Sequence, residues 1–137
     1  MDALGPILVD CSVWVPALRA HGGEAEKQRV AALLAGGRAA VTEIILLELW
    51  RGAKPGREQE RVAELARDLP LLGSTPAVWQ RSNELARRCR KSGFLVPLGD
   101  LLVAACAWEY GVTIEQRDIH FEQIQSVLPE GKRILFP

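Results

Sequence analysis

The chain has 137 residues, with 17 Lys and Arg, 17 Asp and Glu, and a formal net charge of zero. This length suits one hydrophobic core, so we expect residues 1–137 to form a single domain. The 48% of hydrophobic residues excludes a disordered chain. Three cysteines without paired spacing do not indicate a disulfide framework or a zinc site, and we interpret them as small buried side chains in a reducing cytoplasm.

The neutral total hides an uneven distribution of charge. Residues 51–91 hold ten bases and five acids, whereas residues 1–50 hold four and six, and residues 92–137 hold three and six. The N-terminus lacks the basic start and apolar stretch of a secretion signal. The longest apolar run, Leu101 to Trp108, is much shorter than the roughly 18 residues of a membrane span. We therefore expect a cytoplasmic protein without membrane contact.

Predicted strands alternate with predicted helices along the chain. In order, the first half is expected to form a strand at 7–9, helices at 12–19 and 24–34, a strand at 39–41 and a helix at 42–52. Next come a predicted helix at 57–68, a strand at 69–72 and a helix that starts at Thr75-Pro76 and is stopped by Gly93. The chain then continues with a helix that starts at Asp100 and ends before Gly111, followed by a strand at 112–114. A short helix from Asp118 and an edge strand at 133–136 complete the predicted elements. Short apolar strands between helices are typical of an α/β domain whose mainly parallel sheet is covered on both faces.

Three aspartates stand near the ends of these predicted elements. Asp10 follows the first strand, Asp118 follows the strand at 112–114, and Asp100 precedes an apolar helix. Each of them could simply cap a helix, a role for which Asp is favoured. Ligands in this fold class bind at the carboxyl ends of the strands, however, and Asp10 and Asp118 both lie there.

Glu48 is a fourth candidate, because it lies within the apolar segment from Ile44 to Trp50. A carboxylate in an apolar helix either faces water or needs a partner, since its desolvation is unfavourable. Glu43 falls on a different helix face, and we expect it to be a surface residue. Four converging carboxylates would repel one another, a cost that a bound cation removes. Oxygen ligands suit Mg²⁺ or Mn²⁺, and this indicates phosphodiester hydrolysis or phosphoryl transfer.

Other common active sites are excluded by particular residues. The segment Asp10-Cys11-Ser12 after the first strand lacks the glycines of a dinucleotide-binding turn, and the chain has no P-loop motif. Ser12 stands where an aspartyl-phosphate phosphatase would need a second acid. No serine-hydrolase elbow is present, and neither His21 nor His120 belongs to a recognisable triad.

Four segments of the chain carry these acids in a recognisable order. They are Val9 to Trp14 around the first acid, Thr42 to Gly52 with its E-L-x-x-G ending, Pro97 to Ala105 around the third acid, and Asp118 to Phe121 as a closing D-x-[DH]-F. Together they resemble the PIN-domain family, and within it the VapC-type toxins of toxin–antitoxin pairs, over essentially the whole chain. The chain departs from the family at Cys11 and Gln116, where Thr is common, and at His120, which replaces the extra Asp of many members.

The resemblance implies a three-layer α/β/α PIN-like domain with a short, mainly parallel central sheet. It also implies a metal-dependent endoribonuclease that hydrolyses RNA phosphodiester bonds. The acids that would hold one or two Mg²⁺ or Mn²⁺ ions, and so activate a water, are Asp10, Glu48, Asp100 and Asp118.

Further residues receive roles through the same resemblance. Ser12 and Thr42 would orient the acids or contact phosphate, unless they are ordinary helix caps. Arg51 and Lys54 follow Glu48 and would bind RNA phosphates close to the metal, which gives the basic middle of the chain a use.

The resemblance also implies partners. A cognate antitoxin would cover the acidic pocket, and two toxin copies would pair as a homodimer. Trp14, Leu46 and Trp50 would line an apolar groove beside the site, or would simply belong to the core. Two alternatives stay open: a PIN-fold module that binds RNA or protein with little catalysis, and an RNA-processing nuclease outside any toxin pair.

Overall fold

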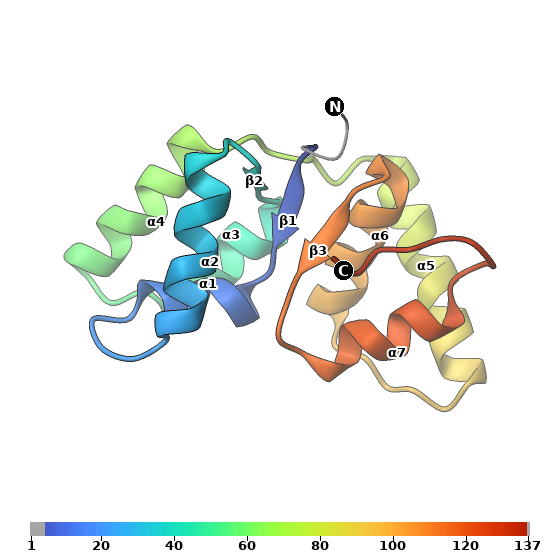
Figure 1. Ribbon diagram of the computed structural model, residues 1–137. Helices are drawn as coiled ribbons and strands as arrows, with labels where there is room; N and C mark the ends of the chain where they lie inside the picture. The colour runs from blue at the N-terminus through green and yellow to red at the C-terminus, as the bar shows by residue number, and fades with distance from the viewer. Residues whose placement is uncertain (1–4, 137) are drawn as a thin grey trace.

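A short parallel sheet lies at the centre of the computed structural model, which describes residues 5–136 (Figure 1). Its strands are β1 (Ile7–Val9), β2 (Ala39–Ala40) and β3 (Thr113–Glu115), in the order β2-β1-β3. Leu8 of β1 lies opposite Ala40 on one side and Ile114 on the other. The side chains of β1 are almost completely buried, because helices cover both faces of the sheet.

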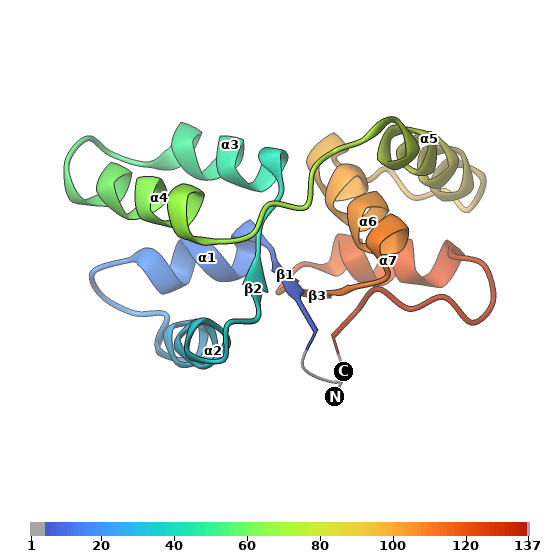
Figure 2. The same ribbon diagram turned by 90° about the horizontal axis from the view of Figure 1, so that it is seen from above.

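The helices form two groups, one on each side of the sheet (Figure 2). The first group contains α1 (Cys11–Leu18), α2 (Glu24–Ala35), α3 (Glu43–Gly52) and α4 (Arg57–Asp68). The second group contains α5 (Pro76–Lys91), α6 (Leu98–Tyr110) and α7 (Ile119–Val127). This arrangement confirms the predicted α/β class with a parallel sheet between helical layers. Within residues 5–136, no helix combines the length and the apolar character needed to cross a membrane.

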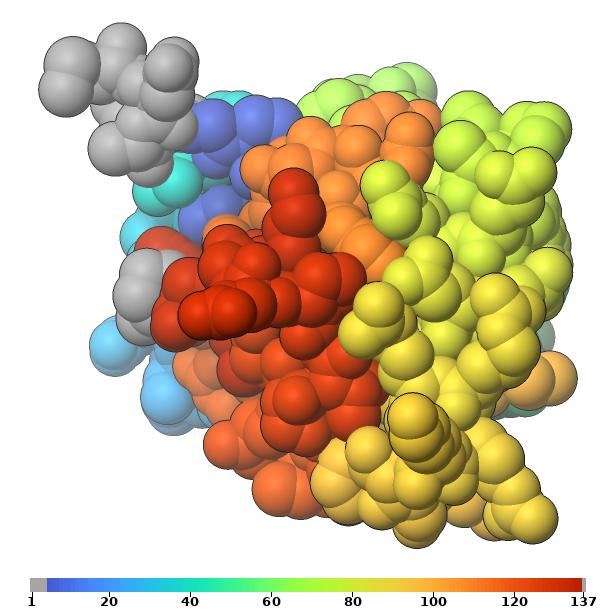
Figure 3. Space-filling view, turned by 90° about the vertical axis from the view of Figure 1, so that its right-hand side faces the viewer, coloured from blue at the N-terminus to red at the C-terminus, as the bar shows by residue number. Residues whose placement is uncertain are grey.

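The second group is held together by contacts between α5, α6 and α7. Figure 3 shows the outer face of this group, where the second half of α5 lies beside α7. Arg88 of α5 joins the two helices, because its guanidinium donates a hydrogen bond of 3.1 Å to the carbonyl oxygen of Val127. This packing holds α6 and α7, whose first turns carry two of the predicted acids.

Two predicted strands are wrong in extent, since the structure reduces each to a single bridge. In the segment 69–72 only Leu71 pairs with the sheet, opposite Val41, because Pro70 has no backbone N–H to donate. In the segment 133–136 only Leu135 pairs, opposite Ile114. Both bridges are parallel, so the sheet continues weakly beyond its three strands on either side.

Local capping explains where several helices begin. The hydroxyl of Thr42 accepts a hydrogen bond of 3.2 Å from the N–H of Ile45, and Thr75 caps α5 in the same way. The predicted start of the helix at Asp100 is wrong. The helix α6 begins at Leu98, after the extended residue Pro97, and Asp100 lies in its first turn.

Candidate active site

The carboxylate of Asp10 stands at the carboxyl end of β1 and is only 4% exposed. Its Oδ2 atom accepts hydrogen bonds from the N–H and the hydroxyl of Ser12, at 2.9 and 2.7 Å, and so caps α1. Burial raises the pKa of Asp10, although the bonds from Ser12 act in the opposite direction. Asp10 is therefore a helix cap and, at the same time, an acid facing the predicted site.

Two further acids meet a histidine at the same edge of the sheet. Asp118 follows β3 and caps α7, and Asp100 projects from the first turn of α6. The ligand atoms of Asp100, Asp118 and His120 all lie within 4.8 Å of one another. His120 stands in the closing D-x-[DH]-F segment, where it replaces the extra Asp of many family members.

The nitrogen Nδ1 of His120 lies 3.2 Å from Oδ2 of Asp100 and 2.9 Å from Oδ1 of Asp118. Neither approach has the angles of a hydrogen bond, so this buried nitrogen has no hydrogen-bond partner among residues 5–136. A buried polar atom without a partner is unfavourable and calls for an explanation.

Glu48 approaches Asp10 from α3, close enough for the charge of Asp10 to raise its pKa. A Cβ atom placed on Gly99 would lie only 3.0 Å from Oε2 of Glu48, which shows how closely this carboxylate approaches the start of α6. The thiol of Cys11 lies 3.7 Å from Oε1 of Glu48. Glu43 is exposed, as predicted.

The cysteines divide into two kinds. Cys89 and Cys106 are buried as expected, but Cys11 is only partly buried and has the acids Asp10 and Glu48 as its neighbours. The prediction that all three cysteines are apolar filler is therefore wrong for Cys11. Burial, and then the charges of the two acids, raise the pKa of this thiol, so it stays protonated at neutral pH.

Three of the four predicted acids, Asp10, Glu48 and Asp100, have raised pKa values. Burial, followed by the charges of Asp10 and Asp118, raises the pKa of Asp100 to about 7. Burial and the charge of Asp10 likewise raise the pKa of Glu48. The structure thus places Asp100 and Asp118 in one cluster with His120, and the negative charges of Asp10 and Glu48 also act on Asp100. Oxygen donors and an unpartnered imidazole nitrogen form a donor set that fits a divalent cation.

The two hydroxyl residues occupy different places. The hydroxyl of Ser12 donates to Asp10 and accepts a hydrogen bond of 2.9 Å from the N–H of Arg117, so it links α1 to the loop after β3. Thr42 is fully buried and caps α3. Its hydroxyl bonds to the backbone of its own helix, as the capping alternative predicts.

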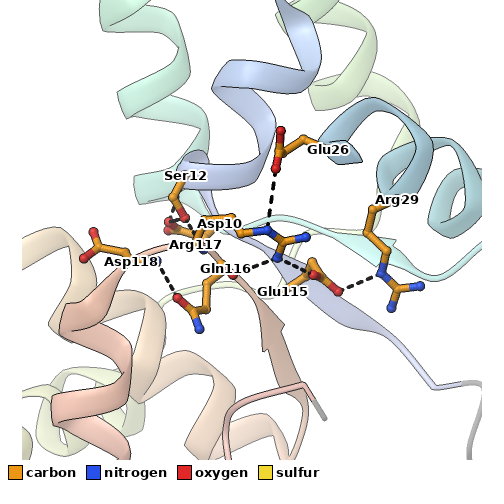
Figure 4. Close-up of polar contacts among 8 residues, drawn as sticks. All are labelled: Asp10, Ser12, Glu26, Arg29, Glu115, Gln116, Arg117 and Asp118. Atoms are coloured by element: carbon orange, nitrogen blue, oxygen red, sulfur yellow. Dashed lines mark hydrogen bonds and ion pairs between the residues drawn. The ribbon is translucent and has the colours of Figure 1, made fainter. Parts of the chain in front are cut away.

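A buried ion-pair network lies behind this edge of the sheet (Figure 4). Glu115 is 8% exposed, and its carboxylate accepts hydrogen bonds from Arg29 at 2.8 Å and from Arg117 at 2.7 Å. Burial alone would raise the pKa of Glu115, but the two guanidinium groups outweigh it and lower the pKa. The side chain of Gln116 accepts a hydrogen bond of 2.6 Å from the N–H of Asp118.

The sequence analysis missed this network. The predicted strand ended at Ile114, whereas β3 continues to Glu115 and carries it into the interior. A glutamate directly after an apolar strand was the available signal, but its partner Arg29 is 86 residues away. Nothing in the local pattern connects the two residues.

The predicted RNA-binding residues flank Glu48. Arg51 is exposed and lines a hollow with Leu47, Glu48 and Trp50, and its charge opposes the rise in the pKa of Glu48. Lys54 is exposed and lines a second hollow that also borders Glu48.

The predicted apolar groove is only partly formed. Trp50 is 40% exposed and lines the hollow beside Glu48, and Leu46 is half-buried. Trp14 has no exposed surface and belongs to the core.

Comparison with known proteins places this arrangement in a family. The family model described as PIN domain matches residues 7–126. Two curated relatives are each 32% identical over 125 residues, covering 88% of this chain and 92% of the relative. They are VapC ribonuclease Mb1587 of Mycobacterium bovis and Ribonuclease VapC11 of Mycobacterium tuberculosis.

Solved structures share the fold at lower identity. VapBC2 from Rickettsia felis, bound to a DNA fragment from its promoter, matches with a TM-score of 0.72 at 19% identity over 95% of this chain and 96% of that chain. The toxin–antitoxin protein VapBC-5 from Mycobacterium tuberculosis matches with a TM-score of 0.67 at 22% identity over 96% of both. The family match and the 32% identity over most of the length show that this chain belongs to the PIN-domain family, in the group of the VapC ribonucleases.

Proposed function

We propose that this protein is a metal-dependent endoribonuclease, the toxin of a toxin–antitoxin pair, and that it hydrolyses RNA at the site formed by Asp10, Glu48, Asp100 and Asp118. The observation that carries the proposal is the cluster of Asp100, Asp118 and His120, whose ligand atoms lie within 4.8 Å of one another. Burial and neighbouring negative charges also raise the pKa of Asp10, Glu48 and Asp100. Its curated relatives are named ribonucleases, which supports RNA as the substrate.

The four acids would hold at least one Mg²⁺ or Mn²⁺ ion. When bound, the cation supplies Lewis acidity that activates a water molecule and offsets the charge that develops on the phosphoryl group. The raised pKa values are consistent with this role, because a neighbouring cation relieves the repulsion between the carboxylates.

The protein's own residues hold the acids in place. Ser12 fixes the orientation of Asp10 through two hydrogen bonds to Oδ2 of its carboxylate. Helix caps fix Asp118, whose Oδ1 atom accepts the N–H of His120. Acids held on short strands and helix starts lose little entropy on binding a cation, so the site is preorganised.

Arg51 and Lys54 would hold the RNA on either side of the reacting phosphate. Each lines a hollow that borders Glu48, and neither forms an ion pair within residues 5–136. Exposed cations without a carboxylate partner are suited to neutralise phosphates.

An RNA-cleavage assay tests the proposal. The protein is expected to cleave RNA with Mg²⁺ or Mn²⁺, and EDTA or the substitution Asp10→Asn should abolish cleavage. Asn keeps the oxygen that accepts from Ser12, so the fold should survive while the negative charge is lost. The control is Asp68→Asn, since Asp68 is exposed and pairs with the exposed Arg67. Cleavage that persists in both EDTA and Asp10→Asn would contradict the metal mechanism, and no cleavage of any RNA would favour a binding module.

We also propose that an antitoxin covers this site. The similar solved structures include toxin–antitoxin complexes. Beside Glu48 lies a hollow whose accessible apolar lining includes Val15 and Leu18, together with charged side chains such as Arg19 and Glu58. An apolar centre with a charged rim favours a protein partner. Adding the product of a neighbouring small reading frame to the cleavage assay should stop RNA hydrolysis. Unchanged hydrolysis by a stoichiometric mixture would speak for a nuclease outside a toxin pair.

We further propose that two copies of the chain pair in the cytoplasm. Three leucines support pairing because they are unusually exposed: Leu95 at 90%, Leu98 at 79% and Leu47 at 63%. Burial of such exposed leucines against a second copy would remove apolar surface from water and so favour pairing. Sedimentation of the purified chain should give a dimer. A monomer at high concentration would exclude this pairing.

A further inference from the structure

The imidazole nitrogen Nδ1 of His120 stands between two acids of the site. This atom lies 3.2 Å from Asp100 and 2.9 Å from Asp118, and it has no hydrogen-bond partner among residues 5–136. The side chain as a whole is 32% exposed, so only the edge that carries Nδ1 is buried against the acids.

These separations match those of ligands that share a metal ion. Neighbouring ligands of an octahedral ion, each at about 2.1 Å from the metal, lie about 3 Å from each other. The two distances from Nδ1 to carboxylate oxygens are close to this value. An ion held by both carboxylates could therefore take Nδ1 as a third ligand without a large movement of any of the three side chains.

The backbone supports the same arrangement. Oδ1 of Asp118 accepts a hydrogen bond of 3.0 Å from the N–H of His120, which fixes the two residues relative to each other at the start of α7. Asp100 comes from a different helix, α6. The imidazole is thus held where two helix starts meet, and this position orients a ligand.

Imidazole nitrogen changes which cation binds best. Mg²⁺ prefers oxygen ligands and keeps several waters, whereas imidazole suits transition-metal ions, and Mn²⁺ accepts oxygen and nitrogen together. A site with two or more carboxylates and one imidazole is therefore better matched to Mn²⁺ than an all-carboxylate site.

We infer that His120 is a direct ligand of the catalytic cation through Nδ1, and that it makes this site prefer Mn²⁺ to Mg²⁺. The inference rests on the proposed metal-dependent nuclease function and names the metal class for it. The competing interpretation is that the imidazole only offsets the charge of the two acids and never touches the cation.

Pulsed electron paramagnetic resonance on the protein loaded with Mn²⁺ distinguishes these two interpretations. A coordinated imidazole gives a hyperfine coupling from its ¹⁴N nucleus, and an uncoordinated one does not. We expect this coupling in the wild-type protein and its loss in His120→Ala and in His120→Asp. The chain has only one other histidine, His21, which is exposed in the loop before α2. His21→Gln is therefore the matched control and should keep the coupling.

Calorimetric titration with each ion alone gives a second measurement. In His120→Ala the affinity for Mn²⁺ should fall at least about tenfold, and more than the affinity for Mg²⁺. His120→Asp restores an oxygen ligand, so it should recover Mg²⁺ affinity while the preference for Mn²⁺ decreases. Equal losses for the two ions would contradict the role of His120 in metal preference.

The outcomes separate this inference from the proposed function. Wild-type protein that binds Mn²⁺ and cleaves RNA, but shows no ¹⁴N coupling, would overturn the inference and leave the nuclease proposal intact. A coupling that persists in His120→Ala would also overturn it, because another nitrogen would then be the ligand. Failure to bind Mn²⁺ at all would contradict both.

Discussion

Asp10 shows how one side chain in this protein combines a structural and a chemical task. It caps α1 through Ser12, and it is also an acid of the proposed site. The two tasks are compatible because both hydrogen bonds from Ser12 go to Oδ2. The same carboxylate can therefore cap a helix and bind a ligand.

Gly99 leaves room for the carboxylate of Glu48 because glycine has no side chain. A Cβ atom there would lie 3.0 Å from Oε2 of Glu48, so Gly99→Ala should displace this carboxylate. Because misplacement of a catalytic group lowers the reaction rate steeply, we expect the rate of RNA cleavage to fall about tenfold or more. The free energy of unfolding should stay unchanged or rise by up to about 1 kcal/mol, since Ala is favoured over Gly in helices. Cleavage rates and urea unfolding curves measure the two effects.

The control for this substitution is Gly73→Ala. A Cβ atom on Gly73 would also face a glutamate carboxylate, that of Glu43, but at an ordinary contact distance of 3.6 Å. Cleavage should be unaffected in this variant. Unchanged cleavage in Gly99→Ala would show that Glu48 tolerates displacement.

Arg51 is the side chain whose role depends most directly on charge. Arg51→Glu should weaken RNA binding and flatten the dependence of affinity on salt, because fewer counter-ions are released when one phosphate contact is lost. Binding measured over a range of NaCl concentrations should give a slope smaller by about 0.7 or more for single-stranded RNA. Arg67→Glu, at an exposed position on α4, is the control. An unchanged slope in Arg51→Glu would remove Arg51 from the RNA-binding surface.

The helices and strands are tied together behind the site by Glu115. This residue ends β3 and accepts from Arg29 of α2 and from Arg117 of the following loop. Arg117 in turn lies 3.6 Å from Glu26 of α2 and, through its backbone, donates to Ser12. The network therefore fixes α2, β3 and the start of α1 relative to one another.

Substituting Glu115→Gln should weaken this tie. We expect the free energy of unfolding at pH 7 to fall by about 1–2 kcal/mol, a value reduced from that of a fully buried pair because both arginines are partly exposed. The folded protein lowers the pKa of Glu115, so its contribution is present above the ordinary carboxyl pKa and is lost as the pH falls through the lowered value.

Urea unfolding at two pH values checks this expectation. The difference between wild type and Glu115→Gln should be clear at pH 7 and should shrink below about pH 4. Glu130→Gln, in an exposed turn, should show no such difference at either pH. A constant difference at both pH values would mean that packing rather than charge explains the role of Glu115.

The carboxylates of the proposed site make the stability of the whole molecule depend on pH. In the metal-free protein the pKa of Asp100 is raised to about 7, and those of Asp10 and Glu48 are raised as well. A folded state with raised carboxyl pKa values binds more protons than the unfolded chain between about pH 4 and 7. The free energy of unfolding should therefore fall as the pH rises through this range.

Denaturation in EDTA at pH 5 and at pH 8 measures this loss, which we expect to be at least about 1 kcal/mol. Asp100→Asn should flatten the pH dependence, because it removes the acid with the pKa of about 7. Saturating Mn²⁺ should restore stability at pH 8 by binding only the folded state. Metal-free protein that is more stable at pH 8 than at pH 5 would contradict the proposed convergence of the acids.

Much of this protein follows from local pattern. Helical periodicity and capping residues such as Thr42 and Thr75 predict most helices, and the short apolar runs predict the central strands. The sequence also nominates the four acids of the proposed site, because parallel strands end at one edge of a sheet and a carboxylate beside an apolar run is unusual. The neutral net charge also has a local explanation, since acids gather at the site and bases gather between residues 51 and 91.

Long-range contacts set the rest. The pairing of Glu115 with Arg29, the approach of Glu48 to Gly99 and the position of His120 between Asp100 and Asp118 each join residues from separate elements. Periodicity and capping act over a few residues, so they contain no information about which distant side chains will meet. These contacts depend on how the helices pack on both faces of the sheet. They place the acids close to one another and to Nδ1 of His120, and so form the proposed metal site.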